Sequence, residues 1–335
     1  MITFEHVTKQ YPDGTVAIED VSFTVEEGTT TVLVGPSGCG KTTTMKLVNC
    51  LEEPTEGTVY RDGTPLAEFD PIQVRRNTGY VIQEIGLFDH MTVAANVATV
   101  PKLNGWDAEA IDARVDELLE LMDLPPEDYR DQHPTELSGG QRQRVGVARA
   151  LAADPDVLLM DEPFGALDPI TRENLQDEFL KIQGELDTTI LFVTHSIDEA
   201  LKMGDRIAIF DVGEVVQYDT PQAILDEPKN EFVEDFIGSD RPLKKLKVTS
   251  VEEVMSSATE GFATVGGEAG ATAAAPSDGE RGREVTALER TDTALSALSR
   301  LVESEAGTLP VVDDGEVIGT VSDEDIRRSN AGEQP

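Results

Sequence analysis

The stretch that decides the fold reads Gly35-Pro36-Ser37-Gly38-Cys39-Gly40-Lys41-Thr42. It fits the pattern G-x-x-x-x-G-K-[ST], in which a glycine-rich loop wraps phosphate groups with its backbone N–H groups. A short β-branched run at residues 30–34 precedes the loop, and the sequence predicts a helix over residues 42–51 after it. The pattern requires this strand–loop–helix context, and the helix N-terminus adds partial positive charge. The stretch therefore predicts a binding site for a nucleoside triphosphate.

Two side chains of this loop have chemistry of their own. Lys41 is expected to reach the β- and γ-phosphates, and Thr42 is expected to offer its hydroxyl group to Mg²⁺. The predicted nucleotide contacts of the region are Gly35, Pro36, Ser37, Gly38, Cys39, Gly40, Lys41, Thr42 and Thr43.

A pair of acidic residues follows a second apolar run. Residues 157–160 are Val-Leu-Leu-Met, and Asp161 and Glu162 come directly after them. A buried strand would deliver both carboxylates to the carboxyl edge of a parallel sheet, where open α/β folds bind their ligands. We expect Asp161 to hold Mg²⁺ and Glu162 to orient and deprotonate an attacking water. The structural alternative is that the two acids only cap the turn before Pro163.

A second anion-binding sequence lies about a hundred residues after the loop. Ser138, Gly139, Gly140 and Gln141 stand at the start of a helix predicted through residues 142–153. The N-terminus of a helix attracts anions, yet this one has no phosphate of its own. We expect it to act on a nucleotide that another copy of the protein presents.

The chain is long enough for about two domains. Residues 1–240 alternate strands and helices, with strands expected at 157–160 and 189–193 and an amphipathic helix at 108–122. Residues 241–284 are expected to form a short basic hinge (243–248) and a flexible linker. Residues 285–330 form a last compact piece, with a helix at 294–303 and strands at 309–312 and 317–321 around a turn at Asp314-Gly315.

Composition excludes several function classes. The 335 residues carry a formal net charge of −38, which opposes binding to a nucleic-acid backbone, so no nucleic acid is expected as a partner. No run approaches the roughly 18–20 apolar residues of a membrane span, and the N-terminus lacks the pattern of a signal peptide. We therefore expect a cytoplasmic location, in a host whose high salt screens the charge. An ordinary acidic protein is the alternative.

With these motifs in order, residues 1–240 resemble the nucleotide-binding subunit of an ATP-binding cassette (ABC) importer. The resemblance implies an α/β P-loop NTPase fold with a RecA-like core, an antiparallel β subdomain and a helical subdomain. It also implies that ATP and Mg²⁺ are bound, and that two copies form a homodimer. Tyr11 resembles the aromatic residue that stacks on adenine, and Gln83 resembles the glutamine that touches Mg²⁺ and water. Asp168 resembles the D-loop aspartate, and His195 the switch histidine at the γ-phosphate.

These likenesses complete the expected site. The predicted catalytic residues are Glu162, His195 and Gln83, and the predicted metal ligands are Thr42, Gln83 and Asp161. Residues 138–141 and Asp168 would contact the nucleotide held by the second subunit.

Four segments resemble in sequence the quaternary amine branch of these importers, which transports glycine betaine, proline, choline or carnitine. They are residues 83–93, 97–103, 168–172 and 216–221. The branch implies integral membrane permease subunits, an extracytoplasmic substrate-binding protein, and a peripheral place at the cytoplasmic face of the membrane. An importer for another solute, such as an amino acid, is the nearest alternative. A soluble ABC ATPase that transports nothing and a purely regulatory binding module are more distant ones.

The C-terminal piece resembles the second half of a CBS (cystathionine-β-synthase-type) module, a small α+β domain. The sequences of residues 309–313 and 319–325 resemble that half. Residues 249–265 are a candidate for the partial start of such a unit. In these modules the positions of Ser322 and Asp325 often hold a nucleotide. Here Asp323 and Glu324 place negative charge beside them and argue against a bound phosphate. One complete unit that pairs across the dimer and a degenerate module kept for dimer contacts are both open.

Overall fold

The computed structural model describes residues 1–83, 85–165, 167–183, 188–257, 263–265, 272–274, 284–304, 307–313 and 316–330. The chain divides into two compact units, Met1–Pro221 and Gln222–Pro335. The domain boundary that the sequence suggests at residue 240 stays a prediction. The expected turn at residues 314–315 and much of the expected linker lie outside the described residues.

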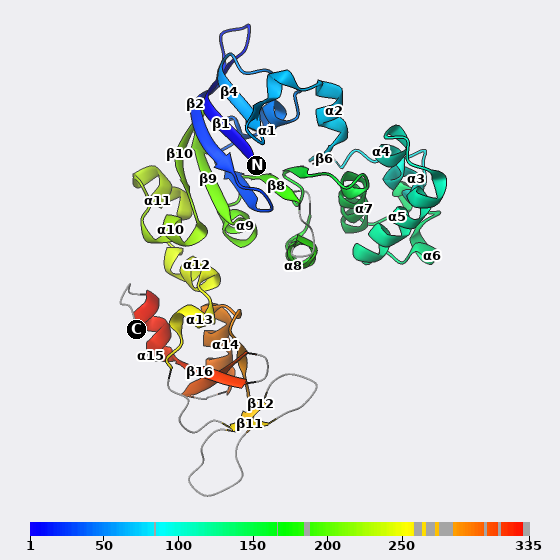
Figure 1. The fold of residues 1–335 in the computed structure, drawn as a ribbon. Coiled ribbons are helices and arrows are strands. Elements are labelled where there is room, and N and C mark those ends of the chain that lie inside the picture. Colours follow the sequence, from blue (N-terminus) through cyan, green and yellow to red (C-terminus); the bar gives the residue numbers. More distant parts are fainter. Residues whose placement is uncertain are drawn as a thin grey trace, which may run out of the picture. The chain divides into compact units, whose positions relative to one another are not determined.

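The first unit is built on a six-stranded sheet in the order β10-β9-β3-β8-β7-β6 (Figure 1). Neighbouring strands are parallel except β9 and β10, which are antiparallel. Every residue of β3 and β8 is buried, which explains why these strands appear in the sequence as continuous apolar and β-branched runs. The strands are β3 (Thr30–Val34), β6 (Thr78–Val81), β7 (Val157–Asp161), β8 (Thr189–Thr194), β9 (Arg206–Asp211) and β10 (Glu214–Asp219).

A second, antiparallel sheet has the order β2-β1-β4-β5. Phe4 on β1 and Phe23 on β2 stack with ring centroids 4.6 Å apart, and both belong to a buried cluster that includes Leu33 and Leu159 of the larger sheet. The strands are β1 (Ile2–Gln10), β2 (Val16–Val25), β4 (Glu56–Arg61) and β5 (Thr64–Pro65). The expected antiparallel subdomain is confirmed.

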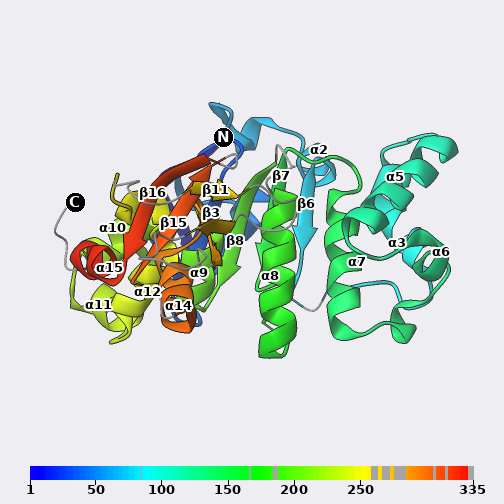
Figure 2. The same cartoon turned by 90° about the horizontal axis from the view of Figure 1, so that it is seen from below.

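Several helices of the first unit form a group of their own. Helices α3 to α7 gather on the side of β6, away from the antiparallel sheet, and make the expected helical subdomain (Figures 1 and 2). The helices are α1 (Lys41–Val48), α2 (Pro71–Arg76), α3 (Val93–Val97), α4 (Thr99–Leu103), α5 (Ala108–Leu121), α6 (Pro126–Tyr129), α7 (Gly139–Leu151), α8 (Pro169–Gln183) and α9 (Ile197–Met203), with 3₁₀ turns η1 (Leu66–Glu68) and η2 (Pro134–Glu136). Among all described residues, no helix is both long and apolar enough to cross a bilayer.

The second unit has a small mixed sheet, β14-β15-β16, in which β14 and β15 are parallel and β15 and β16 antiparallel. A separate sheet has the order β11-β12-β13. The strands are β11 (Ala263–Val265), β12 (Thr272–Ala274), β13 (Glu284–Thr286), β14 (Leu288–Glu289), β15 (Thr308–Asp313) and β16 (Glu316–Ser322). The helices are α10 (Pro221–Asp226), which begins at the last residue of the first unit, α11 (Glu231–Ile237), α12 (Arg241–Val248), α13 (Val251–Val254), α14 (Ala294–Ser304) and α15 (Asp323–Asn330).

The expected basic hinge is wrong: residues 243–248 belong to helix α12. Pro242 stands in the first turn, where a missing N–H costs nothing, and Lys244 pairs with Asp240 at 2.6 Å. Leu246 packs in a buried cluster with Val251 and other apolar side chains of the second unit. The run of lysines is therefore part of a helix that buries Leu246 together with Lys244, the latter paired with Asp240. In the segment after α12, the backbone of Ser256 pairs with Thr320 on β16.

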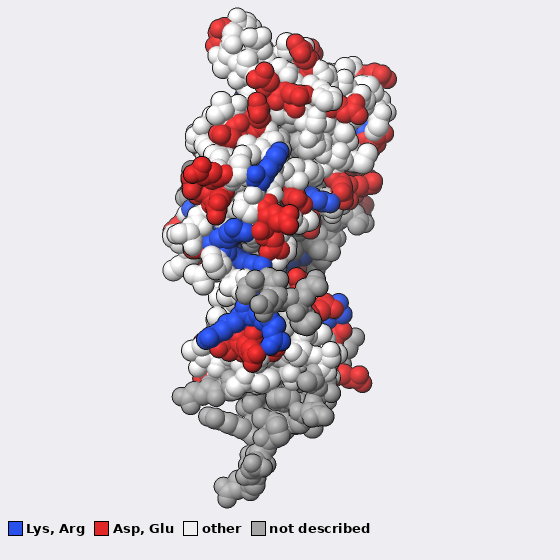
Figure 3. Space-filling view, turned by 90° about the vertical axis from the view of Figure 1, so that its left-hand side faces the viewer, with Lys and Arg blue, Asp and Glu red and all other residues white. Residues whose placement is uncertain are grey.

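The charge of the surface leads to a first prediction. Carboxylates are spread over the face shown in Figure 3, with Lys and Arg gathered in smaller patches. With a net charge of −38, the folded chain repels itself, and added salt screens that repulsion. We expect the melting temperature to rise steadily in KCl between about 0.15 M and about 1 M, over which the Debye length falls from about 8 Å to about 3 Å. A melting temperature that did not respond to KCl would favour the ordinary acidic protein.

Candidate functional site

The phosphate-loop residues link β3 to α1 along a path that only glycine permits. The φ angle of Gly40 is +104°, and a Cβ atom there would lie 2.5 Å from the carbonyl oxygen of Ala17. A Cβ atom on Gly35 would lie 2.3 Å from the carbonyl oxygen of Phe210. The loop is thus packed against neighbouring backbone, and its remaining members Pro36, Ser37 and Gly38 are exposed.

Lys41 lies inside this loop, with only 5 % of its surface exposed. Its ammonium group donates to the carbonyl oxygens of Gly35 (2.7 Å) and Pro36 (2.9 Å) and lies 3.5 Å from Cys39 Sγ. A buried ammonium held by neutral carbonyls is a cation without a counter-charge among these contacts. An anion such as a phosphate group would complete it.

Asp161 ends β7 beside the loop. Its Oδ1 accepts from the Thr42 hydroxyl group at 3.4 Å. Burial, followed by the nearby charge of Glu162, raises the pKa of the Asp161 carboxyl group. Burial and the charge of Asp161 together raise the pKa of Tyr80, on β6, to about 12. Both shifts show that ionisation of the Asp161 carboxyl group is disfavoured where it stands.

These features fit Mg²⁺. A carboxylate with a raised pKa beside a hydroxyl oxygen gives the hard oxygen ligands that this ion takes. No cluster of three or more His, Cys, Asp or Glu suited to a metal occurs among the described residues. A few protein ligands are expected for Mg²⁺ because it usually keeps several waters and binds through one or two carboxylates and substrate phosphates.

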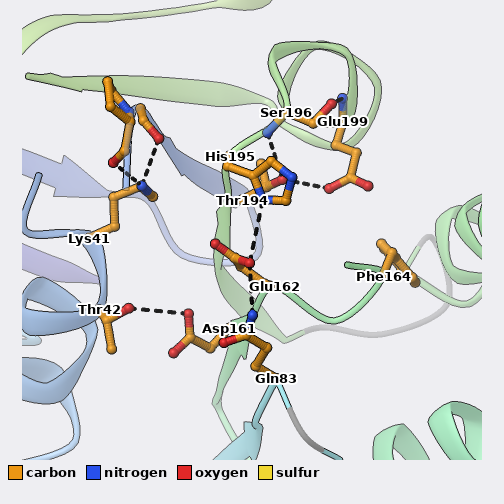
Figure 4. A network of polar contacts seen from close by, with 12 residues as sticks. Lys41, Thr42, Gln83, Asp161, Glu162, Phe164, Thr194, His195, Ser196 and Glu199 are labelled. Carbon is orange, nitrogen blue, oxygen red and sulfur yellow. Dashed lines mark hydrogen bonds and ion pairs between the residues drawn. The ribbon is translucent and has the colours of Figure 1, made fainter. Parts of the chain in front are cut away.

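Glu162 is the meeting point of the predicted catalytic residues (Figure 4). Its Oε2 accepts from Gln83 Nε2 at 3.1 Å and lies 3.4 Å from His195 Nδ1. The three residues come from the ends of β6, β7 and β8, which are parallel neighbours. Glu162 has a φ angle of +46°, and its N–H donates to the Val193 carbonyl at 2.9 Å, so a hydrogen bond to β8 holds the strained residue in place.

The half-buried carboxyl group of Asp161 is expected to lower the stability of the nucleotide-free protein at neutral pH. A raised pKa means that the folded state resists ionisation, so stability falls as the pH rises from the ordinary Asp value through the folded value. In nucleotide-free protein at pH 7, we expect Asp161→Asn to raise the melting temperature, on the order of 2–4 °C for each kcal/mol recovered. The gain should shrink towards pH 4, where the parent carboxyl group becomes protonated.

Asp168 supplies the control for this melting experiment. Its Oδ1 accepts from the backbone N–H of Thr171 at 3.1 Å, and the side-chain and backbone hydrogen bonds of Thr171 lower the pKa of this exposed carboxyl group. Asp168→Asn should therefore not raise the melting temperature at pH 7. An equal gain from both variants would mean that general charge reduction, rather than burial at Asp161, is responsible.

Tyr11 lies at the edge of the loop. Its hydroxyl group is 3.5 Å from Thr43 Oγ1, and the ammonium group of Lys9 lies 5.3 Å from the centre of its ring. The ring is half-buried. This position is close enough to the phosphate loop for the ring to face a base bound beside it.

The second anion-binding sequence lies in the helical subdomain. The Ser138 hydroxyl group accepts from Gln141 N at 3.3 Å, and Gln141 Oε1 accepts from Ser138 N at 2.8 Å, so the two residues cap α7 in a capping box. Gln141 also donates to Tyr129 OH at 3.0 Å. Among the described residues, no hydrogen bond or ion pair joins residues 138–141 to the phosphate loop.

Sequence reasoning missed the residues that hold these motifs in place. Arg149 on α7 donates to the carbonyl oxygens of Ile85 (2.8 Å) and Gly86 (2.7 Å), just after Gln83. Burial lowers the pKa of Arg149. Glu199 on α9 accepts from Thr194 beside His195. The sequence offers no signal that singles out Glu199, because Asp198 and Glu199 together form the acidic first turn that is usual at a helix N-terminus.

Comparisons with known proteins agree with this geometry. The family described as ABC transporter matches residues 18–165, and the CBS domain matches residues 282–332. The carnitine transport ATP-binding protein OpuCA of Listeria monocytogenes is 54 % identical over 257 residues. That alignment covers 76 % of this chain but 64 % of the relative, so the chain spans a little less than two thirds of it.

A relative from Escherichia coli (strain K12), the glycine betaine uptake system ATP-binding protein YehX, is 42 % identical over 328 residues, or 97 % of this chain and 99 % of that protein. A solved structure, described as the dimeric post-hydrolysis state of the ATP-binding cassette MJ0796 bound to ADP and Pi, has a TM-score of 0.59 and 34 % identity. It covers 66 % of this chain and 99 % of its own. This chain therefore belongs to the ABC transporter family, among the ATP-binding proteins that include those of carnitine and glycine betaine transport, and it carries a CBS domain.

Proposed function

We propose that this protein hydrolyses ATP to energise the import of a quaternary ammonium osmoprotectant, of the glycine betaine type, through a partner membrane permease. The observation that carries the ATPase is the convergence at Glu162, where one carboxylate oxygen meets both Gln83 and His195. Lys41 and Thr42 begin α1 after the loop that follows β3, and Thr42 contacts Asp161 at the end of β7 in the same sheet. The printed names of the relatives support the solute class.

Each residue has a proposed part in hydrolysis. Lys41 turns its ammonium group to the β- and γ-phosphates, and the backbone N–H groups of the loop bind the same oxygens. Glu162 takes a proton from the attacking water, which Gln83 and His195 help to orient. Mg²⁺, held by Thr42, Gln83 and Asp161, would neutralise charge on the phosphates. Tyr11 would stack on adenine.

We propose a homodimer as the working unit. The capped N-terminus of α7 offers free N–H groups and a partial positive charge, which suit the γ-phosphate of ATP on a second copy. Asp168 would lie at the same interface. The similar cassette MJ0796 is described as dimeric, which supports this arrangement.

The remaining partners follow from the transport proposal. Permease subunits would bind the cassette near Phe88, whose ring is 41 % exposed beside the Arg149 guanidinium group. Asn96, fully buried, accepts from Phe88 N at 2.8 Å and donates to its carbonyl oxygen at 3.1 Å, which holds this surface in shape. The protein would thus sit at the cytoplasmic face of the membrane, and an extracytoplasmic binding protein would deliver the solute.

Reconstitution tests the proposal. The full chain would be co-purified with its permease and placed in vesicles together with the substrate-binding protein. Labelled glycine betaine should accumulate only with ATP, and labelled glutamine should not. ATP-driven glutamine uptake would favour an amino acid importer, whereas hydrolysis with no permease association would favour a soluble ABC ATPase.

A further inference from the structure

A buried carboxylate, Glu199, lies beside the turn formed by Thr194, His195 and Ser196 (Figure 4). It is 7 % exposed and belongs to the first turn of α9. Its Oε2 accepts from the Thr194 hydroxyl group at 2.5 Å, and its Oε1 accepts from Gln176 Nε2 of α8 at 3.2 Å. One carboxylate thus joins the end of β8 to α8.

The residues on both sides of His195 are tied to Glu199. The Thr194 hydroxyl oxygen accepts from Ser196 N at 3.0 Å while its proton points to Glu199. The Ser196 hydroxyl oxygen in turn accepts from Glu199 N at 3.3 Å. The His195 side chain is 59 % exposed and lies 3.4 Å from Glu162. Its direction is therefore set by a short turn that Glu199 holds.

Arg172 connects the same carboxylate to the segment that follows Glu162. Its Nε lies 3.7 Å from Glu199 Oε1 and donates to the Phe164 carbonyl oxygen at 3.2 Å. Its Nη2 donates to the Leu167 carbonyl oxygen at 3.0 Å. Phe164 is itself buried, with its ring 5.9 Å from that of Phe192 on β8.

Stability alone is a poor reason for this arrangement. Burying a carboxylate costs free energy unless it is paired and hydrogen-bonded, and well-packed apolar side chains often stabilise a fold equally well. The Arg172–Glu199 pair and its hydrogen bonds are directional, so they fix the orientation of the groups that they join, which apolar packing does not. The pair joins the turn that carries His195 to the segment that follows Glu162.

We propose that Glu199 and Arg172 are positioning residues of the hydrolytic site. They set the placement of the His195 imidazole relative to the Glu162 carboxylate, and neither touches the reacting atoms. The inference rests on the ATP hydrolysis proposed above. It predicts that the pair governs the rate of the chemical step and leaves the affinity for ATP alone.

Kinetics of the full chain test this. Glu199→Gln loses the charge that faces Arg172, and we expect kcat for ATP hydrolysis to fall about tenfold to a hundredfold, with KM for ATP changed less than about twofold. Thr194→Val should likewise lower kcat and leave KM nearly unchanged, because valine keeps the shape of the side chain and lacks the hydroxyl group. Thr194→Ser keeps the hydroxyl group and should restore most of the rate. If Glu199→Gln fails to fold, the comparison of Thr194→Val with Thr194→Ser still tests the proposal.

A matched control lies between the same two helices. Lys202 on α9 pairs with Asp177 on α8 at 2.7 Å, and the Asp177 side chain is 55 % exposed where that of Glu199 is 9 % exposed. Lys202→Gln removes an ion pair between the same two helices and should keep the parent kcat. If it lowered kcat as much as Glu199→Gln, the joining of α8 to α9 would matter, and the proposed positioning would be wrong.

A double-mutant cycle completes the test. If Arg172 and Glu199 act through each other, Arg172→Gln combined with Glu199→Gln should cost no more in kcat than the worse single variant. Full additivity, or an unchanged kcat in Glu199→Gln, would overturn the inference while parent hydrolysis still supports the ATPase. Absence of hydrolysis in the parent protein would instead refute the proposed function itself.

Discussion

Glu162→Gln is expected to reduce the rate of ATP hydrolysis by roughly 10²–10⁴-fold, the range that a general base contributes. The amide still donates or accepts near Gln83 and His195, which lie 3.1 Å and 3.4 Å from the parent carboxylate, so the site keeps its shape. The amide has no basicity, however, and the attacking water keeps its proton. ATP should therefore stay bound, and the protein should accumulate as an ATP-bound dimer, measurable by size-exclusion chromatography and by retained nucleotide.

Glu173 provides the control for this variant. It is an exposed glutamate on α8, outside the proposed site. Glu173→Gln makes the same chemical change and should keep the parent rate and a nucleotide-dependent monomer–dimer exchange. If Glu162→Gln hydrolysed ATP at the parent rate, Glu162 would not be the general base.

The order of the strands explains why the predicted catalytic residues lie close together. The phosphate loop follows β3, Asp161 ends β7 with Glu162 directly after it, and His195 follows β8. These strands are neighbours in one parallel sheet. Parallel strands bring their carboxyl ends to one edge, so an apolar run followed by two acids is enough to predict that Asp161 and Glu162 lie there. The part of His195 is implied only by the family resemblance. Lys41 and Thr42 needed only their local motif.

The positioning pair could not be predicted in this way. Arg172 and Glu199 lie 27 positions apart in the chain, and each stands on a helix whose buried face depends on tertiary packing. A charged residue in a helix is usually a solvated one, so the pattern favours exposure for both. Residues 243–248 show the same limit, because their lysines suggest a hinge while the packing of Leu246 makes them a helix.

A mixture of two inactive variants is expected to recover activity if the site is shared between subunits. Lys41→Met removes the cation that we propose for the β- and γ-phosphates, and charge-assisted hydrogen bonds of this kind are worth about 1.5–3 kcal/mol each. Ser138→Asp keeps a good N-cap for α7 and repels the γ-phosphate of the partner's ATP. Each variant alone should hydrolyse little ATP. In an equal mixture, half the dimers are mixed and hold one intact site, so we expect about a quarter of the parent rate.

The recovery depends on where the two half-sites lie. In a mixed dimer both substitutions fall in one site, and the other site combines the intact Lys41 of one copy with the intact Ser138 of its partner. If Lys41 and Ser138 of one chain served the same ATP, every site in the mixture would contain a defect and no activity would return. Ser138→Asn caps α7 as well as Asp does, without the charge, and should retain most of the parent rate. Because no hydrogen bond or ion pair joins Ser138 to Lys41 within the described chain, we expect the mixture to be active.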